Sequence, residues 1–273
     1  MALVPFPSAS PAPRGPDDDP RIELTDAEDL DVAGAKMSFL EHLDELRRRL
    51  IASVYGLAVG CVIAFLLVGK IQDFILGPLH ALMPGGERFV YQQGFEPFML
   101  TVKIGALGGL FIASPFIIWQ LWLFIAPGLY SHEKKFAIPF VLFSTFFFLS
   151  GAAFSHFVAF PWTWRFFLGW ENEYMRFLPS IGPVFSLYVK MLLGFGVVFQ
   201  MPTVVFFLAR MGLVSAGFLV RHTKYAILII FILAAVISPG GDIPSQMLMA
   251  VPMLGLYGFS IFVAWMFAKK QID

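Results

Sequence analysis

The sequence contains little charge and almost no cysteine. Only 14% of its 273 residues are charged, and Cys61 is the single cysteine. Soluble domains are nearer to one quarter charged, so this composition excludes an ordinary soluble protein. A lone cysteine cannot form an intramolecular disulfide, and it therefore says nothing about the redox compartment.

The motifs of common enzyme classes are also missing. The sequence has no Walker A loop, no HExxH motif, no metal-spaced set of His and Cys, and no evident Ser-His-Asp pattern. No internal repeat is visible, which disfavours an inverted-repeat transporter. We therefore expect a protein that is not an enzyme, without a cofactor, a metal or a nucleic-acid partner.

Apolar residues are what the sequence has in abundance. They make up 58% of the chain, with 32 phenylalanines, and the mean hydropathy is +0.75. A bilayer core of about 30 Å needs about 20 apolar residues per helix. Six apolar runs predict an all-α integral membrane protein with six transmembrane helices: 50–69, 98–126, 136–160, 183–209, 225–239 and 244–267.

Proline lies inside four of these runs. In membrane helices proline bends the helix axis and leaves carbonyl groups without their helical hydrogen bonds, and neighbouring helices then donate to these groups. We therefore predict curved, Pro-kinked helices that enclose a concave, glove-like surface, although shape alone allows a pore or a groove equally. The prolines are Pro115, Pro139, Pro202 and Pro252.

Lysine and arginine between the runs predict the orientation. With the N-terminus inside, the inner segments carry ten basic residues outside the tail: Arg47, Arg48, Arg49, Lys134, Lys135, Arg210, Arg221, Lys224, Lys269 and Lys270. The outer loops, about 70–97 and 161–182, carry four: Lys70, Arg88, Arg165 and Arg176. The positive-inside rule therefore predicts that both termini are cytoplasmic.

The N-terminal segment 1–36 differs from the rest of the chain. It holds eight acidic and three basic residues, a balance of −5, and it is rich in proline. It has no basic start and no uninterrupted apolar stretch, so it is not a secretory signal peptide. We expect a disordered cytoplasmic tail, with a membrane domain over 37–273 and Met37 as an alternative start.

The stretch "MSFLEHLDELRRRL" at 37–50 precedes the first run. Ser38 and Glu41 fit a capping box, and Glu45 lies four residues before Arg49. An interfacial amphipathic turn with one helix ion pair explains this pattern without any ligand. Docking of a cationic partner on Glu45 is the functional alternative.

The stretch "FIAPGLYSHEKKF" at 124–136 forms the predicted inner loop between the second and third runs. Glu133 is its only acid, and Lys134 and Lys135 can neutralise it. The alternative is a docking point for a cation. Because Glu45 and Glu133 are both predicted at the inner surface, they could form one acidic patch for guanidinium groups.

Several polar residues are predicted within the membrane, where ionisable groups are costly and suggest function. Lys103 and Lys190 lie near helix ends and can snorkel. Gln200 precedes Met201-Pro202, and it could bond carbonyls that the proline frees or serve function directly. Asp242, in the turn "SPGGD", is expected to cap the sixth run. Gln120 and Gln246 are two further polar residues within the predicted spans.

Four stretches together resemble one family. "FLEHLDELRRRL", "WQLWLFIAPGLYSHEKK", "FGVVFQMP" and "SPGGDIPSQMLMAVPM" are similar, in this order, to motifs of the TatC family. TatC proteins are multi-span receptor subunits of the twin-arginine translocation system. The resemblance covers about 37–267 and implies a receptor in the bacterial inner membrane for folded precursors, which cross by using the proton motive force.

The resemblance also implies roles for individual residues. Glu45 and Glu133 match the acids that receive the arginine pair of the signal peptide. Pro78 and Asp242 match outer positions that are important for assembly, and Gln246 matches a docking position for the single-span partners TatA and TatB in a multi-subunit complex. Residues near the peptide site are matched by Leu43, Arg47, Arg49 and Phe124.

The sequence departs from the family at Gln200, where many members have glutamate. An amide retains hydrogen-bonding capacity but carries no titratable charge, which puts an obligatory proton transfer at this position in doubt. The alternative function is a small-molecule or ion transporter that uses Lys103, Lys190 and Gln200 within the membrane.

Overall fold

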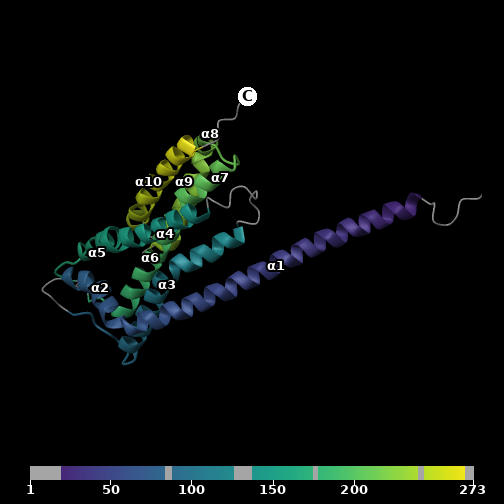
Figure 1. The fold of residues 1–273 in the computed structure, drawn as a ribbon. Coiled ribbons are helices and arrows are strands. Elements are labelled where there is room, and N and C mark those ends of the chain that lie inside the picture. The colour runs from purple at the N-terminus through teal and green to yellow at the C-terminus, as the bar shows by residue number, and fades with distance from the viewer. Residues whose placement is uncertain (1–19, 84–87, 126–136, 175–177, 239–242, 268–273) are drawn as a thin grey trace, which may run out of the picture. The chain divides into compact units, whose positions relative to one another are not determined.

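The computed structural model describes residues 20–83, 88–125, 137–174, 178–238 and 243–267, with side chains from Leu40 onward. The chain divides into two units, residues 1–49 and 50–273, which are treated separately. The helices, labelled in Figure 1, are α1 (Pro20–Leu66), α2 (Val68–Ala81), α3 (Glu96–Ile125), α4 (Ala137–Phe154), the π-helix η5 (Ser155–Ala159), α5 (Phe160–Leu168), α6 (Ile181–Val198), α7 (Met201–Arg210), α8 (Ala216–Arg221), α9 (Thr223–Ile237) and α10 (Ile243–Phe267).

Within the described residues, five helical stretches are long and apolar enough to cross a membrane. They are Leu40–Leu66, Glu96–Ile125, Phe140–Leu168, Ile181–Arg210 and Ile243–Phe267. A sixth apolar helix, Thr223–Ile237, is shorter. The predicted all-α membrane fold class is confirmed, and six spans fit the six predicted runs.

The structure differs from the predicted boundaries in two segments that the sequence assigns to the outer side. The predicted loop 70–97 contains most of helix α2, because Ile75 and Leu79 lie one turn apart and bury their side chains in the core. The third span does not end at Pro161 but continues through η5 into α5. Pro161 directly follows the π-helix η5, whose altered hydrogen-bond pattern lets the helical stretch continue past it.

The fourth predicted run is two helices. Helix α6 ends at Val198 and α7 begins at Met201, with Pro202 in the first turn of α7. Proline therefore separates two helices here. In α3 and α10, Pro115 and Pro252 lie within helices that remain single elements.

Helix α1 begins well before the first apolar run. Residues 20–36, which the sequence assigns to a disordered tail, are part of α1. Their Glu, Ala and Leu residues favour helix, and acids near a helix start suit its dipole. Residues 1–19 lie outside the described residues, so the disorder predicted for them stays a prediction.

Small residues bring the last part of α1 close to α3. A Cβ atom on Gly109 would lie 2.6 Å from Cα of Cys61, and one on Gly60 would lie 2.5 Å from the carbonyl oxygen of Gly109. Membrane helices approach closely where small residues face each other. The two glycines therefore set how near these helices can come.

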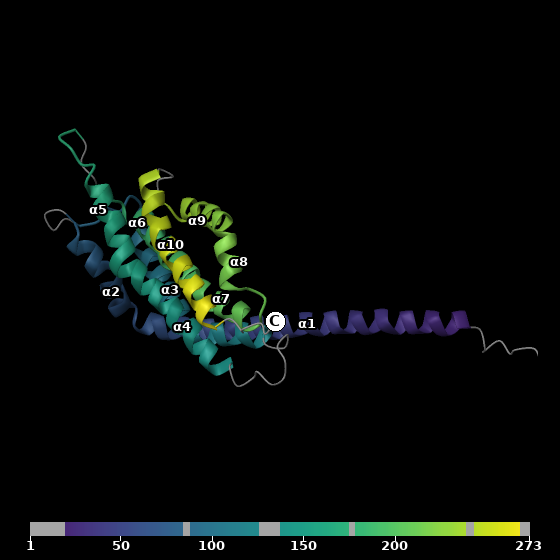
Figure 2. The same cartoon turned by 90° about the horizontal axis from the view of Figure 1, so that it is seen from above.

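The segments that precede α3 and α6 are hydrogen-bonded to each other through their backbones. The N–H of Val90 donates to the carbonyl of Pro179 over 3.2 Å, and the N–H of Ile181 donates to the carbonyl of Val90 over 2.9 Å. Helix α6 then carries much of the core, since Phe185, Tyr188 and Phe195 are almost completely buried. Figure 2 shows α10 beside α7 and α9, which it contacts.

Candidate functional site

Glu45 and Arg49 form an ion pair on α1. Nη2 of Arg49 donates to Oε1 of Glu45 over 3.3 Å, and each side chain is 28% exposed. The pair follows from their spacing, because residues four apart are neighbours on one helix face. Among the described residues, the second oxygen, Oε2, accepts no hydrogen bond. The carboxylate is therefore oriented by a guanidinium and still has a free acceptor.

Leu43 and Arg47 lie on another face of the same helix. At about 100° per residue, Leu43 is about 200° from Glu45, so the Leu43–Arg47 face is nearly opposite the Glu45–Arg49 face. Both Leu43 and Arg47 are exposed. The structure thus brings Glu45 and Arg49 together but does not place Leu43 or Arg47 beside them.

The loop that contains Glu133 lies outside the described residues, but the helix ends on either side of it are well anchored. The ring of Trp122 in α3 packs edge-on against Phe140 in α4, with centroids 3.7 Å apart. Nε1 of Trp122 also donates to Oγ of Ser144 over 3.0 Å. Phe124 is half-buried in the last turn of α3. Helices α3 and α4 therefore pack against each other close to the segment that contains Glu133.

Gln200 lies at the joint between α6 and α7. Its Nε2 donates to the carbonyl oxygen of Ser144 in α4 over 2.9 Å. The expectation that Gln200 bonds a carbonyl freed by Pro202 is wrong in this detail, because the acceptor belongs to another helix. The polar group was correctly singled out, but its partner could not be identified from local sequence.

Gln246 connects the last two apolar helices. Its Nε2 donates to the carbonyl of Phe231 in α9 over 2.8 Å, and Oε1 accepts no hydrogen bond from a described residue. Oγ of Ser238 and Oγ of Ser245 are 2.7 Å apart across the same hairpin. Helix α10 begins at Ile243, directly after Asp242, whose predicted capping role lies outside the described residues.

Pro78 stands inside α2, the helix that the sequence prediction missed. It is half-buried between Ile75 and Leu79, whose side chains are in the core cluster. The assembly role predicted for Pro78 stays a prediction.

The three residues of the transporter alternative do not share one site. Lys103 lines a cleft between α3 and α6, and neither Lys190 nor Gln200 lines it. Lys190 is exposed on α6, and Gln200 is engaged with α4. The described residues also contain no cluster of His, Cys, Asp or Glu that could hold a metal ion.

A buried polar pair was not recognised from the sequence. Nδ1 of His156 is 2.9 Å from the hydroxyl of Tyr188, and both side chains are at most 2% exposed. His156 belongs to the π-helix η5, and Phe74 of α2 stacks on its ring at 4.6 Å. An isolated histidine inside an apolar run was the only available signal.

These features define a multi-span α-helical membrane protein in which a few polar side chains connect neighbouring helices. The family model described as "Sec-independent protein translocase protein (TatC)" matches residues 41–252. The chain belongs to the TatC family, as the four motifs suggested. The family is one of protein translocase components rather than enzymes.

Relatives and solved structures agree with this assignment. The Sec-independent protein translocase protein TatC of Desulforapulum autotrophicum is 42% identical over 236 residues, 86% of this chain and 87% of that protein. The TatC protein of Koribacter versatilis is 38% identical over 238 residues, 86% of this chain and 88% of that protein. A crystal structure of the twin arginine translocase receptor TatC, 36% identical, superposes with a TM-score of 0.72 and covers 82% of this chain and 97% of that one.

Proposed function

We propose that this chain is the receptor and scaffold of a twin-arginine translocase. It binds signal peptides that carry two adjacent arginines and recruits single-span subunits of the TatA and TatB type. The similarity to a solved twin arginine translocase receptor supports the first part of this proposal. The names of the curated relatives, Sec-independent protein translocase proteins, support a role in moving proteins across a membrane.

The main support for a peptide site at Glu45 is the set of hydrogen bonds that its carboxylate makes. Its carboxylate already holds the guanidinium of Arg49 through one hydrogen bond, and it retains a free oxygen. Ion pairs of this spacing on a helix surface contribute only about 0.3–0.5 kcal/mol. A guest arginine can therefore use the free oxygen or displace Arg49 at little cost.

Two carboxylates suit a pair of arginines. Guanidinium groups bind carboxylates through two parallel hydrogen bonds, and such charge-assisted bonds are the strong ones. We assign one arginine to Glu45 and the other to Glu133, the only acid between residues 124 and 136. The packed junction of Trp122, Phe140 and Ser144 supports this assignment because it fixes both ends of the Glu133 loop.

The proposal also includes an orientation of the chain in the membrane. Ten basic residues between the apolar runs on one side, against four on the other, favour cytoplasmic termini in the bacterial inner membrane. Glu45 and Glu133 then face the compartment in which precursors are made. The segment 1–36 would extend into the cytoplasm.

Gln246 is the proposed contact for a single-span partner. Gln246 is half-buried, and its amide nitrogen is engaged with α9, but its carbonyl oxygen accepts nothing from the described residues. An unpaired acceptor within an apolar surface attracts a hydroxyl or amide from another helix. Gln200, with its nitrogen bonded to α4, would stabilise the scaffold rather than titrate. Self-association into a multi-subunit complex is part of this proposal.

Site-specific photocrosslinking tests the peptide site. A crosslinker beside Glu133 in the full chain should capture a twin-arginine peptide and should capture a twin-lysine peptide poorly. Glu45→Gln and Glu133→Gln keep the side-chain size but remove the charge. Each should lower apparent affinity about tenfold or more, because charge-assisted hydrogen bonds contribute about 1.5–3 kcal/mol.

The matched control is Glu41→Gln, which removes the same charge one helical turn before Glu45. It should leave crosslinking unchanged while all variants insert equally into membranes. Undiminished crosslinking in the Glu45→Gln/Glu133→Gln double variant would refute the assignment of the site.

A further inference from the structure

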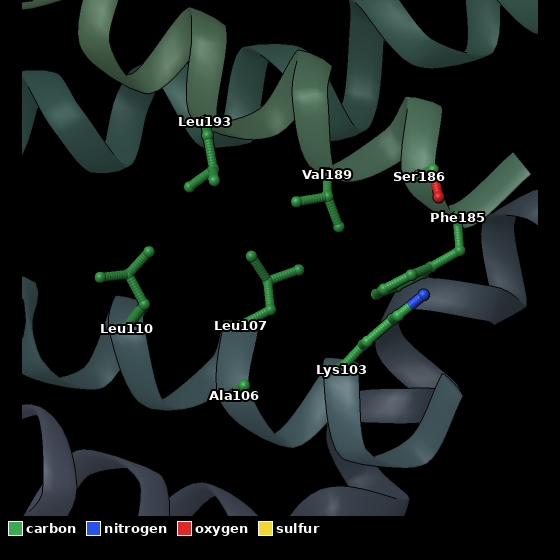
Figure 3. A pocket seen from close by; sticks show the side chains of 8 residues that line it. All are labelled: Lys103, Ala106, Leu107, Leu110, Phe185, Ser186, Val189 and Leu193. Atoms are coloured by element: carbon green, nitrogen blue, oxygen red, sulfur yellow. The ribbon is translucent and has the colours of Figure 1, made fainter. Parts of the chain in front are cut away.

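Helices α3 and α6 line an open cleft that contains none of the residues assigned above to the peptide site or the partner site. Its volume is about 430 Å³, and eight residues line it: Lys103, Ala106, Leu107, Leu110, Phe185, Ser186, Val189 and Leu193. Figure 3 shows the α3 side chains on one wall and the α6 side chains on the other. All eight belong to stretches long and apolar enough to cross the membrane.

The cleft has one polar end and one apolar end. Lys103, Phe185 and Ser186 lie at one end, and Leu110 and Leu193 lie at the other (Figure 3). The polar end is nearer the starts of α3 and α6. By a rise of about 1.5 Å per residue, Lys103 lies about 10 Å after Glu96, and the cleft continues for about another 10 Å to Leu110.

The two polar side chains at the polar end of the cleft, Lys103 and Ser186, have no protein partner within the described part of the chain. Neither Nζ of Lys103 nor Oγ of Ser186 makes a hydrogen bond or ion pair there, and no acid lines the cleft. Lysine offers three donors and serine one. A cation at this depth is costly unless an anion or the interface receives it.

We propose that this cleft binds one anionic phospholipid. The headgroup phosphate is held by Lys103 and Ser186, and one acyl chain lies between Leu107, Leu110, Val189 and Leu193. Helix α3 has 30 residues and is about 45 Å long, about 15 Å longer than a bilayer core of about 30 Å. With about 7 Å of helix outside the core at each end, the cleft, which runs from about 10 Å to about 20 Å along α3, lies within the outermost half of the core and so within a single leaflet.

The chemistry of the lining favours a lipid over a peptide. An extended or helical peptide has backbone donors and acceptors that must be satisfied away from water. Beyond its two polar residues the cleft offers only apolar side chains, which suit an acyl chain that needs no hydrogen bonds. Because the ammonium group of Lys103 has no partner among the described residues, we expect the headgroup of this lipid to be negatively charged.

Native mass spectrometry of the detergent-purified full chain tests the proposal. The probes are phosphatidylglycerol and phosphatidylcholine with identical acyl chains. The wild-type chain should retain the first phosphatidylglycerol at about fivefold lower lipid concentration, the preference that one lysine gives for an anionic headgroup. Lys103→Met should remove this preference, and Ala106→Phe, which fills the cleft, should reduce retention of both lipids.

Lys190→Met is the matched control, because Lys190 is an exposed lysine on α6 that does not line the cleft. It should keep the preference for phosphatidylglycerol. Equal effects of Lys103→Met and Lys190→Met would overturn the proposal, as would displacement of phosphatidylglycerol by inorganic phosphate at equal concentration. Retention of an apolar peptide in place of lipid, abolished by Ala106→Phe, would make the cleft a peptide groove and refute lipid binding.

Discussion

Gln200, at the joint between α6 and α7, donates its amide N–H to the carbonyl oxygen of Ser144 in α4 over 2.9 Å. The hydroxyl of the same serine accepts from Trp122 in α3. One buried residue of α4 thus connects α3 and the α6–α7 joint. An amide at position 200 performs this task without any change of charge.

Replacement of Gln200 by leucine should destabilise the protein modestly. Interhelical hydrogen bonds in membrane proteins contribute about 0.6 kcal/mol on average and up to about 1.7 kcal/mol. Thermal unfolding in detergent should show the loss. Because Gln200 uses the carbonyl and Trp122 uses the hydroxyl of Ser144, Ser144→Ala should add to Gln200→Leu without coupling. A strong coupling energy would contradict this geometry.

Gln200→Glu should make stability depend on pH. A protonated carboxyl group can donate to the carbonyl of Ser144, but an ionised one places negative charge against that oxygen. The variant should therefore unfold at a lower temperature at pH 8 than at pH 5, while the wild type and Gln200→Leu change equally little between these conditions. A variant with the same pH profile as Gln200→Leu would show that position 200 is open to water.

Gln246→Leu should weaken recruitment of a single-span partner. The substitution removes the unpaired carbonyl oxygen as well as the bond to Phe231, while the volume of the side chain is nearly kept. Co-purification with TatA- and TatB-type subunits should fall several-fold. Met247→Leu, at a neighbouring exposed position, should leave it unchanged. Equal co-purification of both variants would place the contact elsewhere.

Gly109→Ala should separate α1 from α3. The new Cβ atom would lie 2.6 Å from Cα of Cys61, and backbone atoms cannot yield as a flexible side chain can. Overpacking of this kind costs about 1–3 kcal/mol, which thermal unfolding in detergent will register. Gly255→Ala in α10 meets nothing within 4 Å and should be neutral or slightly stabilising. A neutral Gly109→Ala would show that the helices can move apart freely.

Apolar run length allowed the spans to be predicted, because a bilayer imposes one length on every helix. Proline was a poorer guide. Pro161 was taken as a helix end although the helical stretch continues past it, from the π-helix η5 into α5. Pro202 was taken as a kink although the chain forms two helices around it. The effect of proline depends on its position in the turn, which hydropathy does not encode.

The candidate site was predictable only where partners are local. The Glu45–Arg49 pair follows directly from the i,i+4 spacing. The partner of Gln200 lies 56 residues earlier and that of His156 lies 32 residues later, so no local pattern connects them. Helix α2 was missed because Lys70, Asp73 and Pro78 interrupt the apolar run in the sequence, which made the segment resemble a loop.

The pair of His156 and Tyr188 provides a last test, on the core around the π-helix. His156→Leu leaves the buried hydroxyl of Tyr188 without its partner, and Tyr188→Phe leaves Nδ1 of His156 without one. Each should cost about 1–3 kcal/mol, the penalty for an unsatisfied buried polar group. The double variant should lose less than the sum, because neither partner is then stranded. Tyr225→Phe, at an exposed tyrosine, should have little effect in the same thermal unfolding measurement. Strict additivity of the two core substitutions would mean that the contact between them contributes nothing to holding α6 against η5.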